Sequence, residues 1–250
     1  MLPINLLDLL ELKFLLNNNL IIREETSRKN ISYNKIPISS TNNPIDYIKE
    51  IIKKYIEKLE DKEKIIIFCN NKEKVRLIAR ELKILYYYSS NNKDKVEEKE
   101  ELEENLNKFL DINNKKDFII VTTIALSIGI NYPYIKVSIY VPTIKSLVNI
   151  IQETGRIARK LEKGYSYLLY YNNIILKPLS INLDKEITTL EEFKILDKYK
   201  ANKLLVTKGY LRKIINKFLD NNLFYISYIN SKEKNSNCLK KEQILESSRK

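Results

Sequence analysis

Hydrophobic positions along the middle of the chain follow two alternating patterns. Short, almost continuous apolar runs predict buried strands, and between them apolar residues spaced three or four apart predict amphipathic helices. Strands that alternate with helices and are apolar on both faces indicate an α/β fold, with a parallel sheet covered by helices on both faces. The strands are expected at 64–68, 84–88, 118–122, 135–141 and 165–170, and the helices at 44–60, 72–83, 94–110 and around 146–151.

The pattern changes toward both ends of the chain and predicts three parts. Residues 1–43 are expected to hold a leucine-rich N-terminal helix and a polar, extended linker. Residues 44–172 are expected to be the α/β domain, and Asn43 before Pro44 is a good helix start. Residues 173–250 are expected to form a small, mostly helical appendage with helices at 188–200 and 203–219 and a disordered tail.

Composition excludes several kinds of chemistry. The sequence has no histidine, which excludes His-dependent nucleophilic triads and imidazole-ligated metals. Two cysteines cannot form a four-cysteine zinc site, and they favour a reduced, intracellular protein. No apolar run approaches the roughly 18 to 20 residues of a membrane span. The net charge of +12 is compatible with binding to nucleic acid. Lysine is enriched over the whole length, however, so the charge by itself does not show whether the protein binds nucleic acid.

Candidate chemistry lies in three segments beside the predicted strands: 69–71, 122–133 and 152–159. Ligands of parallel α/β sheets bind outside the carboxyl ends of the strands, where we expect these segments to meet. The last segment places Arg156 and Arg159 on one side of a helical turn, just after Gly155. Guanidinium groups suit the spread negative charge of a phosphoryl group in transfer. A pair of surface arginines is the alternative, and the order of the three segments argues against it.

These motifs carry a family resemblance. Ile65–Asn71 is similar to helicase motif IV, Val121–Ile139 to motif V, and Val141–Leu147 with Gln152–Arg159 to the stretch that ends in motif VI. Arg23–Tyr33 is similar to a linker strand of the form RxxTxRxNIxY. In this order the motifs resemble the C-terminal RecA-like domain of superfamily 2 helicases, and specifically of RecQ-like DNA helicases. The resemblance implies a RecA-like sheet.

The same resemblance implies a mechanism and site residues. Two RecA-like domains hold ATP and Mg²⁺ between them and move along single-stranded or forked DNA, 3′ to 5′. This chain then needs an ATP-binding RecA-like domain as its partner, in trans or in a longer product, and family analogy suggests a nuclear location. The implied residues are Arg156 and Arg159 as arginine fingers, Gln152, Gly129 and Asn131 at the nucleotide, and Asn70, Asn71 and Thr123 at the DNA.

The chain departs from the family in several places. Its four glycines make no phosphate-binding loop, and it has no Asp-Glu metal motif, so we expect ATP and Mg²⁺ to bind only with a partner domain. Met1–Pro3 falls where the family's motif III would end, which predicts that the first RecA-like domain is lacking. Asn131 replaces an aspartate, and Ser127 and Ala158 replace glycines.

Other features leave alternatives open. Residues 208–220 resemble the start of the RecQ zinc-binding subdomain, but Cys238 is the one cysteine in that region, so no zinc is expected. Cys69 is expected to be a buried thiol, residues 86–88 a strand rather than a base-stacking platform, and residues 97–104 a solvated acidic helix face. The competing functions are the helicase motor half, an inactive RecA-like module that binds nucleic acid or a partner, and a helicase remnant.

Overall fold

The computed structural model describes residues 28, 30–89, 96–123, 126, 132–142, 146–161, 163–173, 189–207, 211 and 214–216. The chain divides into two compact units. The sheet unit consists of Asn30–Ile144 and Gln152–Asn173, and the second unit of Met1–Lys29, Lys145–Ile151 and Ile174–Lys250.

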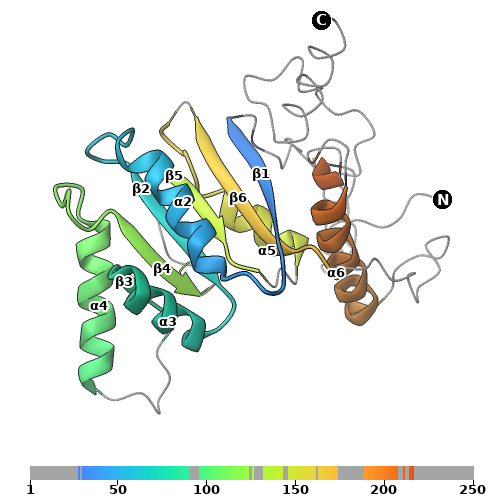
Figure 1. Cartoon of the computed structure of the whole chain (residues 1–250), viewed down its shortest axis with the longest axis horizontal. Coiled ribbons are helices and arrows are strands. Elements are labelled where there is room, and N and C mark those ends of the chain that lie inside the picture. Colours follow the sequence, from blue (N-terminus) through green and yellow to red (C-terminus); the bar gives the residue numbers. More distant parts are fainter. Residues whose placement is uncertain are drawn as a thin grey trace, which may run out of the picture. The chain divides into compact units, whose positions relative to one another are not determined.

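The sheet unit is built on six parallel strands in the order β1-β6-β5-β2-β4-β3 (Figure 1). The strands are β1 Ile31–Ile38, β2 Lys64–Cys69, β3 Leu85–Tyr87, β4 Ile119–Thr123, β5 Ile135–Tyr140 and β6 Gly164–Tyr171. All six residues of the central strand β2 are buried, as expected for a strand covered on both faces. The predicted α/β fold with a parallel sheet is therefore confirmed.

Strand β1 extends the sheet beyond the five apolar strands that the hydrophobic pattern predicts. It pairs along its whole length with β6, from Ile31 opposite Gly164 to Ile38 opposite Tyr171. Its first three residues and its last residue are buried, whereas Lys35 is partly buried and Pro37 is exposed. An edge strand of this kind lacks the continuous apolar run that marks an inner strand, so the segment reads as a polar linker.

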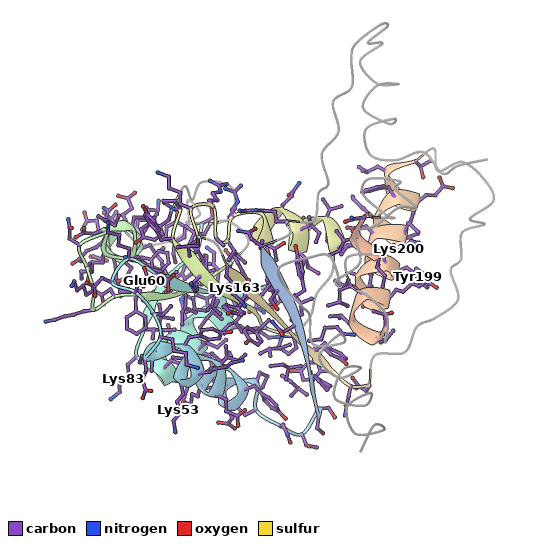
Figure 2. All side chains as sticks on the ribbon, turned by 90° about the horizontal axis from the view of Figure 1, so that it is seen from above. Lys53, Glu60, Lys83, Lys163, Tyr199 and Lys200 are labelled. Carbon is purple, nitrogen blue, oxygen red and sulfur yellow. The ribbon has the colours of Figure 1, made fainter. Side chains whose placement is uncertain are left out.

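Helices lie between successive strands of the sheet. They are α2 Pro44–Ile56, α3 Lys72–Leu82, α4 Val96–Leu110 and α5 Leu147–Thr154, whereas α6 Leu190–Val206 follows the last strand. Helices α2 and α3 cover one face of the sheet, where Ile48 and Val75 pack with Ile65 in the main core (Figure 1). Charged side chains such as Lys53, Glu60 and Lys83 extend from the outer surface (Figure 2).

The second unit contains α6, which departs from the sequence-based expectation. It runs unbroken through the predicted gap between 200 and 203 because Ala201, Leu204 and Leu205 are all buried and continue its packed face. Thr189 begins the helix with a capping box to Glu192. Within this unit the Asp197 carboxylate accepts hydrogen bonds from the backbone amides of Leu147 (2.7 Å) and Val148 (3.0 Å). Asp197 therefore caps the start of α5.

Candidate functional site

Asn70, Asn71 and Thr123 lie at the carboxyl edge of the sheet. The two asparagines follow β2, and Thr123 ends the neighbouring strand β4, where it is the register partner of Cys69. Both asparagines are exposed and Thr123 is partly buried. The Asn71 side chain caps α3, accepting a hydrogen bond from the Lys74 amide at 2.9 Å. The structure thus brings the three predicted nucleic-acid contacts to one edge.

Cys69 lies just beneath this edge and is 3% exposed, as the sequence predicts. Burial raises the pKa of its thiol to about 12. A thiol that stays protonated at neutral pH is a poor nucleophile, so Cys69 belongs to the core rather than to the chemistry of the edge.

The arginine segment, residues 155–160, follows α5 and is held by backbone hydrogen bonds to the start of β5. The Ala158 amide donates to the Ile135 carbonyl at 2.8 Å, and the Lys160 amide donates to the Pro133 carbonyl at 3.2 Å. Ile135 pairs with Lys64, the first residue of β2, so this contact lies at the amino edge of the sheet. The arginine segment therefore contacts the end of the 122–133 segment.

The expectation that all three candidate segments meet at the carboxyl edge is wrong for the arginine segment. A helix that follows a parallel strand runs back toward the amino ends of the strands, and its last turn arrives at the opposite edge. Six residues of β2 separate the two edges, a distance of about 20 Å at roughly 3.3 Å per residue. The molecule thus has two candidate sites rather than one.

The two arginines of the amino-edge site influence each other. Arg159 is exposed and Arg156 is partly buried. Burial lowers the pKa of Arg156, and the positive charge of Arg159 lowers it further. An anion bound beside both guanidinium groups would relieve this repulsion, so the pair suits a phosphate. Gln152, on the last turns of α5, is exposed.

Glu153 is a buried carboxyl of this site that the motif comparison did not single out. It is 3% exposed, and burial raises its pKa to about 8, against the opposing effects of Tyr140 and Arg156. The backbone also links the two residues, because the Arg156 amide donates to the Glu153 carbonyl at 3.1 Å. Glu153 is therefore the acidic group that faces Arg156 from the end of α5.

Ala158 and Gly164 fit together at the base of the arginine segment. Ala158 is fully buried and adopts a left-handed conformation with φ 51°, which favours glycine. A Cβ at Gly164 would lie 2.7 Å from the Ala158 Cβ and 2.9 Å from Ile157 Cγ2. The missing side chain at Gly164 therefore makes room for the methyl group that Ala158 adds to the motif.

Asn30 anchors the same segment from the start of β1. Its side-chain amide donates to the carbonyls of Ala158 (3.1 Å) and Leu161 (2.9 Å), and its own carbonyl accepts from the Gly164 amide at 2.9 Å. The signal for this role was present in the sequence, because Asn30 is the asparagine of the linker-strand pattern. That pattern identifies the residue but not its partner more than 120 positions away.

Known proteins are similar to this chain in sequence and in fold. Residues 45–160 match the family model described as the helicase conserved C-terminal domain. The chain is 32% identical over 138 residues to an Acanthamoeba polyphaga mimivirus protein named "Putative ATP-dependent RNA helicase"; the match covers 53% of this chain and 22% of that protein. Residues 45–160 are therefore similar to the helicase conserved C-terminal domain.

Solved structures support the fold. Two structures of S. cerevisiae Dbp5 bound to RNA and ADP BeF3 match 95% of this chain and 51% of the Dbp5 chain. The TM-scores are 0.53 and 0.52, at 15% and 14% identity. The fold of the six-stranded sheet with its helices is therefore RecA-like. The chain spans about half the length of Dbp5 and about a fifth of the mimivirus protein.

The remaining predicted residues can now be placed. Gly129 and Asn131 lie outside the described residues. Tyr88, from the 86–88 segment, is buried and its hydroxyl accepts from Arg76 Nε at 2.9 Å and donates to Glu98, which gives it a packing role. The Glu98 carboxylate, from the acidic run, also pairs with Arg76. In the part of the chain that the structure describes, no cluster of acidic or cysteine side chains could hold a metal, and no helix is long and apolar enough to cross a membrane.

Proposed function

We propose that this chain supplies the second half of an ATP-driven helicase motor. The observation that supports this proposal most strongly is the position of the arginine segment. The segment is hydrogen-bonded to the start of β5, and it holds the exposed Arg159 close to Arg156. In the assembled motor the two guanidinium groups contact the phosphates of a nucleotide that a P-loop domain binds together with Mg²⁺. ATP supplies the phosphoryl group whose negative charge these side chains stabilise.

The family resemblance also supports roles in nucleotide binding for residues near the two arginines. Gln152 positions the arginines, and Gly129 and Asn131 lie near the ribose. Glu153 is the buried acid on the same turn as Arg156, and with a pKa of about 8 it is mostly protonated at neutral pH, so the positive charge of Arg156 is left for a nucleotide to balance. The whole motor acts inside the cell, and family analogy favours the nucleus.

At the carboxyl edge, Asn70, Asn71 and Thr123 contact the backbone of a single strand. Short polar side chains and backbone amides suit phosphate and sugar contacts, which carry no sequence information. The order of the RecQ-like motifs supports single-stranded or forked DNA, read 3′ to 5′. RNA is the second candidate, because the mimivirus relative is named as an RNA helicase.

The proposal is tested by ATP turnover with a P-loop RecA-like domain supplied in trans and single-stranded DNA or RNA present. Arg159→Ala should lower turnover by at least a hundredfold, because an arginine finger contributes about three to five orders of magnitude in related enzymes. Lys160→Ala is the matched control, since Lys160 is an exposed cation next along the chain. Equal turnover in Arg159→Ala and the wild type would refute the catalytic role.

A binding titration separates the motor from the alternatives. The chain should bind single strands with an affinity that falls as salt rises, and Thr123→Ala should weaken binding, whereas Asn107→Ala on the exposed face of α4 should not. Salt-dependent binding without turnover in the reconstituted complex would favour an inactive nucleic-acid-binding module. No binding at all would favour a helicase remnant. Comparing DNA and RNA strands of equal sequence decides between the two substrates.

A further inference from the structure

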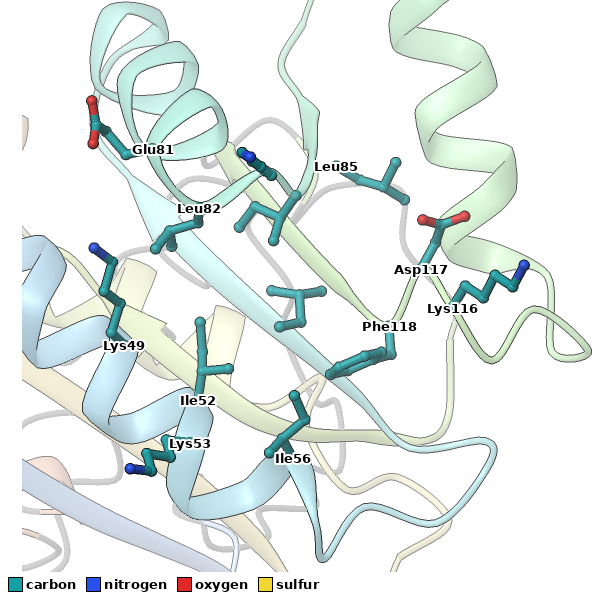
Figure 3. Close-up of a pocket in the computed structure, with 13 residues that line it drawn as sticks. Lys49, Ile52, Lys53, Ile56, Glu81, Leu82, Leu85, Lys116, Asp117 and Phe118 are labelled. Carbon is teal, nitrogen blue, oxygen red and sulfur yellow. The ribbon is translucent and has the colours of Figure 1, made fainter.

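A groove of about 500 Å³ lies between the C-terminal ends of α2 and α3 and above the starts of β3 and β4 (Figure 3). Both helices end at the amino edge of the sheet, so the groove lies away from Asn70 and Thr123. It shares no residue with the arginine segment. Its lining residues are Lys49, Ile52, Lys53, Ile56, Glu81, Leu82, Lys83, Ile84, Leu85, Lys116, Asp117, Phe118 and Ile119.

The floor of the groove is apolar. Ile52, Leu82 and Phe118 are partly buried and pack against the main core on their inner sides. Ile56, the last residue of α2, is 49% exposed at the border of the groove. Apolar area left in water at this position favours binding when a partner covers it.

The border of the groove is positively charged. Four lysines line it, at 49, 53, 83 and 116, against two acidic residues, Glu81 and Asp117. Lys53 and Lys83 project into solvent (Figure 2). In the described part of the chain, none of the four lysines forms a salt bridge. The charge around the groove therefore complements an acidic ligand.

We propose that this groove binds an acidic amphipathic helix of a partner protein. The apolar side chains of such a helix would cover Ile56 and Phe118, and its carboxylates would face the lysines. Single-stranded nucleic acid fits less well, because the floor is mostly aliphatic and Phe118 is the one aromatic ring among the lining residues. The lining of the groove includes no residue of either edge site.

The test uses the full chain and a displayed library of random 16-residue peptides. Selection should enrich peptides with apolar residues three or four apart and with several Asp or Glu residues. The enriched peptide, made synthetically with a fluorescent label, should bind at least tenfold more weakly to Ile56→Glu and several-fold more weakly to Lys49→Glu. Leu77→Glu is the matched control, because Leu77 on α3 is exposed to a similar extent (45%) but does not line the groove.

Each other outcome contradicts the proposal. Enrichment of basic peptides, or of none, would show that the groove does not select an acidic helix. Equal loss of binding in Leu77→Glu and Ile56→Glu would place the peptide elsewhere or indicate general damage. Competition for the same surface by a single-stranded oligonucleotide would assign the groove to nucleic acid. A concentration-dependent dimer that Ile56→Glu breaks, measured by light scattering, would assign it to a second copy of the chain.

Discussion

Substituting Gly164 by alanine tests how the arginine segment is held. Gly164 does not have a positive φ, so its backbone accepts alanine. At such a position Gly→Ala usually stabilises a protein by about 0.4 to 1 kcal/mol, because it restricts the unfolded chain. Here the new Cβ would lie 2.7 Å from the Ala158 Cβ, where ordinary contacts begin near 3.4 Å. We therefore expect the opposite sign.

The size of the effect follows from the packing. Ala158 cannot move away easily, because it is fully buried. Its backbone amide is hydrogen-bonded to Ile135, and its carbonyl is hydrogen-bonded to Asn30. Adding a methyl group to a tightly packed interior costs about 1 to 3 kcal/mol. We expect Gly164→Ala to lower the free energy of unfolding by about 2 kcal/mol, and the midpoint of thermal unfolding by roughly 4 to 8 °C for a chain of this length.

Urea unfolding, followed by circular dichroism, measures the change. Replacing Ala158 by glycine in the same chain removes the Cβ that clashes and also the left-handed strain, which costs about 1 to 2 kcal/mol for a residue with a side chain. The double variant should therefore recover at least half of the stability lost by Gly164→Ala. A Gly164→Ala variant that is as stable as the wild type, or a double variant in which the two effects simply add, would refute the close packing of these residues.

Three further predictions concern the residues that support α5 and the arginine segment. Asp197→Ala should lower the free energy of unfolding by about 1 to 2 kcal/mol, because it leaves the amides at the start of α5 without their cap, and Asp197→Asn should cost less; chemical unfolding compares them. Glu153 has a pKa of about 8 in the folded protein and an ordinary value of 4.5, so the stability that it contributes is present at low pH and is lost as pH rises through 8. Unfolding measured from pH 5 to pH 8 should show that decline, by at most about 1.4 kcal/mol per pH unit, and Glu153→Gln should flatten it; an unchanged slope would contradict the burial of this carboxyl. Asn30→Ala should destabilise the sheet unit by about 1 to 3 kcal/mol and lower ATP turnover in the reconstituted motor, whereas Asn42→Ala on the exposed turn after β1 should do neither.

Local signals in the sequence predict most of the sheet unit. The run Lys64–Cys69 is apolar enough to be recognised as a central strand, and Asn43 before Pro44 marks the start of α2. Strand β1 was harder to recognise as part of the sheet, because its partner β6 begins more than 130 residues later and its middle is polar. Pairing with a distant strand supplies what the local pattern lacks.

In the candidate sites, too, the sequence predicts some features, whereas others depend on contacts between distant parts of the chain. Motif order identifies Arg156 and Arg159, and the adjacent strands bring Asn70 and Thr123 to one edge as expected. The arginines lie at the other edge because of the direction in which α5 runs. The spacing of the motifs along the chain does not predict that direction. The fit of Ala158 against Gly164 depends on a contact between the turn after α5 and the first residue of β6, and neither residue by itself predicts it.

The central claim is that the arginine segment faces a nucleotide held by another domain. Side-chain NMR of arginine Nε–H groups in the ¹⁵N-labelled chain tests it directly, because arginine is scarce in this sequence. Adding ADP and beryllium fluoride together with a P-loop RecA-like domain should shift the signals of Arg156 and Arg159, while the signal of Arg80, on the exposed side of α3, stays unchanged. Signals of both arginines that do not move when the nucleotide-bound domain associates with the chain would contradict the account.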